Sequence, residues 1–125
     1  MIELTLNDCG LDAATEEAFD ASLDIAMAES SFELWASVPD GQAICMLRNG
    51  ADAWLMYLRW PGDSGFRSVG AERSGAASYA LSNGQVDEYP LSWCVDVQSC
   101  FDAFRNFHRH YGARPQCIAW TDADA

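Results

Sequence analysis

The stretch AICMLRNGADAWLMYLRW, residues 43–60, decides the fold class of this chain. It holds two apolar, strand-like segments on either side of Asn49-Gly50, and an Asn-Gly pair in that setting is the strongest short signal for a β-hairpin. Side chains alternate along a strand, so the second segment has two different faces. One face would carry Trp54, Met56, Leu58 and Trp60, and the other Leu55, Tyr57 and Arg59. The stretch therefore predicts two paired antiparallel strands.

Further strand-like segments lie on both sides of this hairpin. Residues 2–6, IELTL, alternate and predict an opening strand, and Phe32–Val38 comes shortly before the hairpin. Downstream, GFRSVGAE at 65–72 and ASYALSNGQVDEYP at 77–90 alternate as well, and Asn83-Gly84 predicts a two-residue turn of the primed type. We expect an antiparallel meander of five or six strands between Phe32 and Pro90.

Two stretches have the period of an α-helix instead. Residues 13–29 predict an amphipathic helix with Asp12 as its N-cap. Its apolar arc would hold Ala18, Phe19, Ser22, Leu23, Ile25 and Ala26, and its acidic arc Glu16, Glu17, Asp20 and Asp24. Residues 96–112 predict a second helix, with Asp96 as N-cap and Gly112 just past its end. Its apolar positions, spaced i, i+3, i+4 and i+7, are Val97, Cys100, Phe101, Phe104, Phe107 and Tyr111.

The order of these elements predicts an α+β fold. A short strand at 116–120, QCIAW, would close the chain. We expect a single domain over residues 1–125, with a mostly antiparallel sheet of about six strands and two helices packed on one face.

The charge is strongly acidic, with 19 Asp and Glu residues against seven arginines, no lysine and a net charge of −12. Such a charge repels nucleic acid and anionic membranes, and it favours a basic partner or serves solubility alone. The chain has no apolar run of about 20 residues and no signal-peptide pattern at its start, so we expect a cytoplasmic protein. Its five cysteines include no Cys-x-x-Cys pair, and we expect reduced thiols without metal or cofactor.

None of the catalytic patterns in the sequence has both the residues and the geometry that its chemistry needs. GDSG at 62–65 resembles a serine-protease loop, but His108 and His110 lie at a helix end among arginines, where a positive field works against a general base. At i and i+2 of a helix, these two imidazoles cannot share a metal ion. Asp87 and Glu88 are adjacent on a strand and point to opposite faces, so they cannot act as a pair. The sequence therefore predicts a protein that is not an enzyme.

Two features allow either a structural or a binding role. The acidic arc Glu16, Asp20, Asp24 is either a solvated helix face or a docking surface for a cationic partner. The five tryptophans are either core residues or part of an interface, for which Tyr57 and Arg59 would offer a mixed surface.

Residues from Phe32 to Trp120 carry a family resemblance. The hairpin ICMLRNGADAWLMYLRW, then GDSGFRSVG, YALSNGQVDEYP, an amphipathic helix and the closing GARPQCIAW make up the pattern. In this order they resemble immunity protein family one of bacterial polymorphic toxin systems. The resemblance implies a non-enzymatic inhibitor, encoded beside a secreted toxin, that blocks the active site or substrate entry of the toxin domain. Deaminase toxins acting on nucleic acid are frequent partners of this family, and their basic grooves suit a protein of charge −12.

We therefore expect one cognate toxin domain as partner, basic and bound 1:1, and neither nucleic acid nor membrane. The expected contact residues are acids and aromatics of the meander's turns and edge: Asp63, Phe66, Glu72, Asp87, Glu88 and Tyr89. The acidic helix face, Glu16, Asp20 and Asp24, ranks second. Two alternatives remain open: a small-ligand pocket built on Tyr57, Arg59 and Trp60, and an adaptor for an unknown partner.

Overall fold

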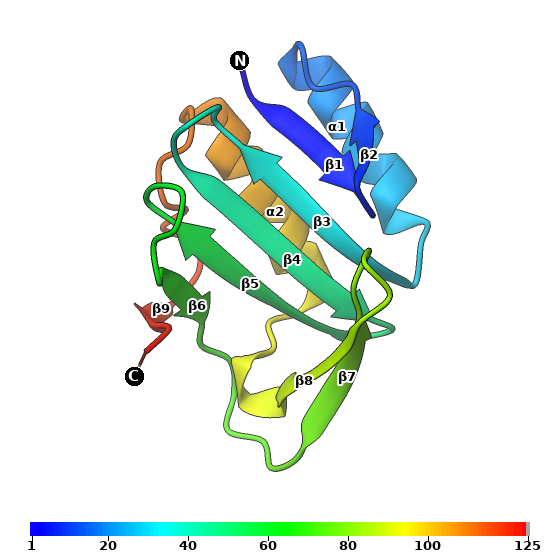
Figure 1. The fold of residues 1–125 in the computed structure, drawn as a ribbon, viewed down its shortest axis with the longest axis vertical. Helices are drawn as coiled ribbons and strands as arrows, with labels where there is room; N and C mark the ends of the chain where they lie inside the picture. The colour runs from blue at the N-terminus through cyan, green and yellow to red at the C-terminus, as the bar shows by residue number, and fades with distance from the viewer. Residues whose placement is uncertain (125) are drawn as a thin grey trace.

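A seven-stranded antiparallel sheet forms the centre of the computed structural model, which describes residues 1–124 (Figure 1). Its strand order is β2-β1-β3-β4-β5-β6-β9, and β7 and β8 form a separate two-stranded sheet. The elements in chain order are β1 (Glu3–Leu6), β2 (Cys9–Leu11), α1 (Glu16–Met27), β3 (Ser31–Ser37), β4 (Ala43–Asn49), β5 (Asp52–Leu58), β6 (Phe66–Ser68), β7 (Ala76–Ala80), β8 (Val86–Pro90), η1 (Leu91–Trp93), α2 (Val97–Arg109) and β9 (Trp120–Asp122).

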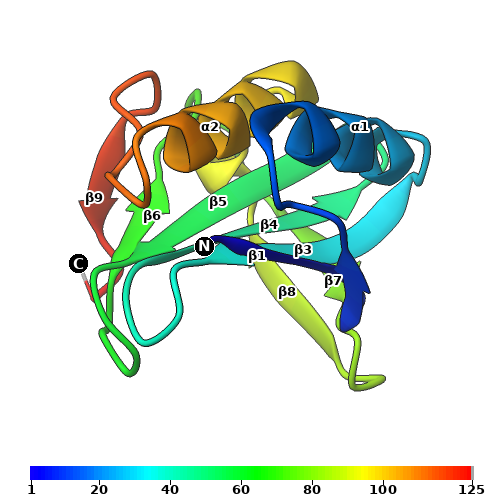
Figure 2. The same cartoon turned by 90° about the horizontal axis from the view of Figure 1, so that it is seen from above.

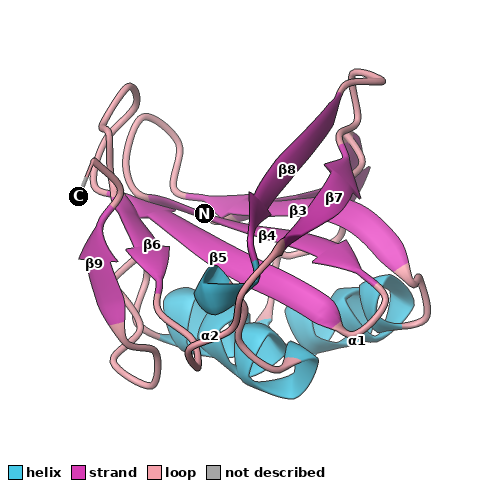
Figure 3. Cartoon of the chain, turned by 90° about the horizontal axis from the view of Figure 1, so that it is seen from below, coloured by secondary structure: helices cyan, strands magenta, loops and turns pink. Residues whose placement is uncertain are grey.

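Both helices lie on one face of the large sheet, and the β7–β8 hairpin projects from the other face (Figures 2 and 3). The main core lies between the helices and the sheet, where Phe19 of α1 and Phe101, Phe104 and Phe107 of α2 are fully buried. The predicted α+β fold with two helices on one face is confirmed, and the large sheet has seven strands instead of about six.

The central hairpin is confirmed, but the second Asn-Gly pair does not form the predicted turn. Leu81 and Gln85 close a three-residue loop, in which the Leu81 N–H donates to Gln85 over 2.8 Å and the Gly84 N–H donates to Leu81 over 3.0 Å. Only Gly84 in this loop has a positive φ, 88°. A primed turn needs that conformation at the first central position, so the prediction for Asn83-Gly84 was wrong.

The first helix begins later than predicted. Thr15, not Asp12, is its N-cap, because the Thr15 hydroxyl accepts a 3.0 Å hydrogen bond from the Ala18 N–H. Asp12 accepts from the Ala14 N–H in the preceding turn instead. Ile25 was placed in the apolar arc, but its side chain is 55% exposed.

The second helix follows its predicted pattern except at its end. Asp96 is the N-cap, accepting from the Ser99 N–H over 2.8 Å. After the helix, Tyr111 takes the left-handed conformation with φ 47°, and the Gly112 N–H donates back to Phe107. This is a Schellman ending displaced by one residue from the prediction. Tyr111 is 56% exposed and outside the core, and the final strand forms at Trp120–Asp122 instead of 116–120.

Candidate functional site

A pocket of about 170 Å³ lies on the sheet face that carries no helix, where the β7–β8 hairpin projects from the sheet. Its lining comes from three strands, the hairpin loop and β8: Glu33, Trp35, Cys45, Leu47, Trp54, Met56, Leu81 and Tyr89. Small-molecule pockets usually measure about 300–1,000 Å³. A space of this size suits the end of one side chain better than a metabolite.

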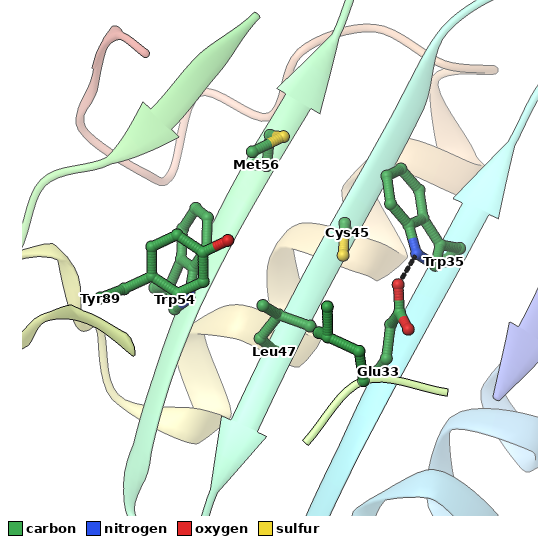
Figure 4. A pocket seen from close by; sticks show the side chains of 8 residues that line it. Glu33, Trp35, Cys45, Leu47, Trp54, Met56 and Tyr89 are labelled. Atoms are coloured by element: carbon green, nitrogen blue, oxygen red, sulfur yellow. Dashed lines mark hydrogen bonds between the residues drawn. The ribbon is translucent and has the colours of Figure 1, made fainter. Parts of the chain in front are cut away.

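Strand register arranges the pocket floor in two rows. Trp35, Cys45 and Met56 are direct cross-strand neighbours on β3, β4 and β5. Glu33, Leu47 and Trp54 form the parallel row two residues away. Because side chains two apart on a strand share a face, all six point toward the hairpin side. Figure 4 shows Trp35 and Tyr89 on opposite sides of the pocket.

Among the described residues, Glu33 is the only carboxylate that lines the pocket. Its Oε2 accepts a 2.7 Å hydrogen bond from the Trp35 indole, and its Oε1 accepts from the Ser82 N–H at 3.0 Å and the Ser82 hydroxyl at 2.8 Å. Partial burial raises the pKa of this carboxyl, but the hydrogen bonds from Trp35 and Ser82 outweigh burial and hold the pKa below its ordinary value. Glu33 is therefore a fixed negative charge, and no arginine in residues 1–124 forms an ion pair with it.

Aromatic side chains form the pocket wall opposite Glu33. The Tyr89 ring lies 4.6 Å from Trp54 and 5.5 Å from Trp93, measured between ring centroids. The Tyr89 hydroxyl donates to Asp87 over 3.2 Å. The indole Nε1 of Trp54 is buried and has no hydrogen-bond partner among the described residues. The wall is thus rich in π faces and carries a second carboxylate beside it.

The pocket offers no nucleophile. Cys45 is 6% exposed, and burial, followed by the nearby charge of Glu33, raises the pKa of its thiol well above the ordinary value. A thiol in this state is neutral and packs as a small apolar group. Within residues 1–124, no three His, Cys, Asp or Glu side chains are grouped as a metal would need. Neither α1 nor α2 has the length and hydropathy of a membrane-crossing helix.

The predicted contact residues of the hairpin region lie at different places relative to this pocket. Tyr89 lines it, and Asp87 is on the same face of β8 as Tyr89. Glu88 points to the opposite face of β8 and is exposed. Glu72 is exposed in the connection between β6 and β7.

The predicted contact residues near β6 take part in a local cluster. Asp63 is bound by the Arg59 side chain at 2.8 and 2.9 Å and by the Arg59 N–H at 3.0 Å, and its side chain is 3% exposed. These hydrogen bonds hold the pKa of the Asp63 carboxyl far below its ordinary value. Two guanidinium groups lie over the Phe66 ring, that of Arg59 at 5.0 Å and that of Arg114 at 4.5 Å from its centroid. Asp63 therefore stabilises the loop between β5 and β6 through its bonds to Arg59.

The helix α1, which carries the acidic arc, lies on the sheet face opposite the β7–β8 hairpin (Figure 2). Glu16 forms an ion pair with Arg109 at 3.1 Å, and Asp20 pairs with Arg105 at 3.5 Å. Both arginines belong to α2, so Glu16 and Asp20 link the two helices. Asp24 is exposed and forms no ion pair within the described residues.

The alternative pocket of Tyr57, Arg59 and Trp60 does not form. Tyr57 is 4% exposed on the helix side of β5, and its hydroxyl donates to the Gly112 carbonyl over 2.6 Å. Arg59 is held by Asp63, with its guanidinium 4.4 Å from the exposed Trp60 ring. The mixed surface predicted from Tyr57 and Arg59 was therefore wrong, because Tyr57 belongs to the core.

The sequence did contain a signal for the pocket. Ile44–Leu47 is apolar at every position, whereas a strand with one face in water should alternate. Ala53–Leu58 is apolar throughout as well. These runs indicate that both faces of β4 and β5 are covered, one by helices and the other by the hairpin. Glu33 and Trp35, spaced i and i+2, point to that second face.

Comparison with known proteins assigns the family. The family model described as immunity protein Imm1 matches residues 7–122, nearly the whole chain. A comparison with curated proteins finds no match. The family match agrees with the resemblance seen in the sequence and extends it through α1 to the β1–β2 turn. The chain therefore belongs to the Imm1 family of immunity proteins.

Proposed function

We propose that this immunity protein neutralises one cognate toxin domain by binding it 1:1 through the sheet face that carries the β7–β8 hairpin. The observation that supports this surface most is the pocket of Glu33, Trp35 and Tyr89, which combines a fixed carboxylate with aromatic walls. Buried aromatic anchors beside a polar rim are typical of the energetic centre of protein interfaces. Family membership supports a toxin as the occupant of this surface.

The charge of the chain supports a basic toxin. A net charge of −12 accelerates encounter with a cationic surface and discourages anionic ones. Toxins that act on nucleic acid, deaminases or nucleases, need a cationic groove for the phosphate backbone. The immunity protein would cover that groove or the active site within it, and so exclude the substrate. In this account it contributes no chemistry of its own and acts in the cytoplasm of the producing cell.

The test uses the toxin domain encoded beside this chain. The purified toxin is assayed on single-stranded DNA, double-stranded DNA and RNA while the immunity protein is titrated in. The proposal expects activity on nucleic acid that falls to background at one molar equivalent, with a 1:1 complex in solution. A toxin that binds the chain but has no activity on any nucleic acid would contradict the substrate class. A toxin that stays active at several-fold molar excess of the chain would contradict the inhibition itself.

A further inference from the structure

We propose that the Glu33 pocket receives a single arginine side chain of the toxin, which anchors the complex. This inference rests on the proposed function, since it names the group that the toxin presents to this surface. The pocket has the Glu33 carboxylate beside the Trp35 ring at one side and the π faces of Trp54 and Tyr89 at the other (Figure 4). A guanidinium complements both, because its N–H groups donate to a carboxylate while its plane stacks on aromatic rings.

The Glu33 carboxylate retains capacity for such a partner. Three hydrogen bonds already reach its oxygens, one from Trp35 to Oε2 and two from Ser82 to Oε1, so of about four lone-pair sites one remains on Oε2 for a single N–H donor. The existing bonds fix its orientation, so little rotamer entropy remains to be lost on binding. The group is therefore positioned in advance for a cation.

Within residues 1–124, no arginine forms an ion pair with this carboxylate. Arg67 pairs in register with Met56 and so lies on the same sheet face, yet its guanidinium stacks 4.4 Å from Trp93 and donates to the Ser68 carbonyl. Arg73 pairs with Asp52, and it is outside the pocket lining. A partly buried carboxylate that lacks a counter-charge within its own protein is suited to bind a cationic group of a partner.

Arginine fits this pocket better than lysine. The ammonium of lysine is compact and strongly hydrated, whereas the planar guanidinium is weakly hydrated and lies flat against rings. The volume of about 170 Å³ holds one side-chain end but not a peptide segment. The rest of the toxin would contact the surface around the pocket, where Asp87 accepts a hydrogen bond from the Tyr89 hydroxyl.

The first test is a double-mutant cycle between the full chain and the toxin domain encoded beside it. Glu33→Gln keeps the side-chain shape and removes the charge, and each arginine and lysine of the toxin surface is changed to Met. We expect Glu33→Gln to weaken binding at least tenfold and to couple with one toxin arginine only. Glu72→Gln, an exposed acid outside the pocket, is the matched control and should change affinity less than twofold. Coupling to a lysine instead would overturn the choice of arginine.

Aromatic variants separate the pocket from general folding effects. Trp35→Phe keeps a π face, so it should retain most of the affinity for the toxin that Trp35→Leu loses. As a folding control, both variants must unfold cooperatively with a stability close to that of the wild type. If a wild-type complex forms but Glu33→Gln and Trp35→Leu bind as tightly as wild type, the arginine pocket is wrong and the proposed function stands. If no complex forms, the proposed function fails. A measurement without the toxin then tests whether the pocket binds an arginine side chain.

That measurement is an NMR titration of the free protein with N-acetyl-arginine amide at millimolar concentrations. N-acetyl-citrulline amide, which has nearly the same shape without the charge, is the control ligand. We expect the Trp35 indole N–H signal to shift with the arginine compound, to shift less with citrulline, and to lose the difference in Glu33→Gln. Equal shifts with both compounds, or no shift with either, would overturn the proposal.

Discussion

The Trp35 indole donates a 2.7 Å hydrogen bond to the Glu33 carboxylate from two positions further along β3. The same carboxylate accepts from Ser82 at the tip of the β7–β8 hairpin. One acid therefore links the large sheet to the hairpin and fixes an aromatic wall at the same time. This arrangement depends on the period of two along a strand, which puts both side chains on one face.

Removing either donor should raise the pKa of Glu33. Trp35→Phe and Ser82→Ala each take a hydrogen bond from the charged form, and hydrogen bonds to that form hold the pKa down. Carbon-detected NMR titration of the Glu33 carboxyl measures the change. Trp60→Phe, at an exposed tryptophan outside the pocket, should leave the Glu33 titration unaltered. Wild-type titration behaviour in both Trp35→Phe and Ser82→Ala would refute the bonding scheme.

Ser68 should contribute strongly to stability although it does not line the proposed contact pocket. It is fully buried, accepts from the Leu55 N–H at 2.9 Å and donates to the Trp93 carbonyl at 2.7 Å. Ser68→Ala leaves both backbone groups without that partner, which should cost about 1–3 kcal/mol in the free energy of unfolding. Urea denaturation measures it, with the exposed Ser74→Ala expected within about 0.5 kcal/mol of wild type. Equal stability of the two variants would contradict this role.

Asp63 should stabilise the fold in a pH-dependent way. Hydrogen bonds from Arg59 place its folded-state pKa far below the unfolded value of about 3.9. A depressed carboxyl pKa gives stability that is complete above the unfolded pKa and is lost as pH falls toward the folded one. The stability gap between wild type and Asp63→Asn should thus be constant near neutral pH and shrink below about pH 4. Urea unfolding at several pH values measures it, and a gap that persists unchanged in acid would exclude this origin.

Charge reversal on β8 should distinguish its two faces. Asp87 shares the face of Tyr89, whereas Glu88 points away. Asp87→Lys should weaken toxin binding at least tenfold, and Glu88→Lys should mainly slow association, because a distant charge acts through steering. Surface plasmon resonance at low and high salt separates the two effects, since screening suppresses steering. A larger affinity loss for Glu88→Lys would place the interface on the other face of the hairpin.

The acids of α1 should matter little for either stability or binding. Glu16 and Asp20 form exposed ion pairs with α2, and such pairs contribute about 0–1 kcal/mol. Glu16→Gln and Asp20→Asn should therefore change unfolding free energy by less than about 1 kcal/mol and toxin affinity less than twofold. Calorimetry of unfolding and of binding checks both values. A tenfold loss of affinity would move the interface to the helix side.

The fold could be predicted from local patterns because most of its strand pairs are hairpins between sequence neighbours. The β1–β2 turn was not predicted from the sequence. In the structure, Asn7 and Asp8 take positive φ angles of 50° and 66° there, as a primed turn requires. The displacement of β7 and β8 from the large sheet could not be predicted, since alternation specifies strands and not their partners. The predicted start of α1 was wrong for a similar reason. Asp12 and Thr15 are both residue types that cap helices well, and tertiary packing determines which of them does so.

The candidate site was predictable only in part. Tyr89 and Asp87 were found from the acid and aromatic content of one short strand. Glu33 and Trp35 were missed because their role depends on β4, β5 and the hairpin loop closing around them. The acidic arc of α1 looked unpaired since its arginine partners lie about 90 residues further along the chain, at a distance that local sequence reasoning cannot connect.

The most direct measurement is the crystal structure of this chain bound to its cognate toxin domain. The account predicts that the toxin lies on the hairpin side of the sheet, with one arginine side chain next to Glu33 and between Trp35 and Tyr89. A toxin seated on α1 and α2, with the Glu33 pocket open to solvent, would contradict it.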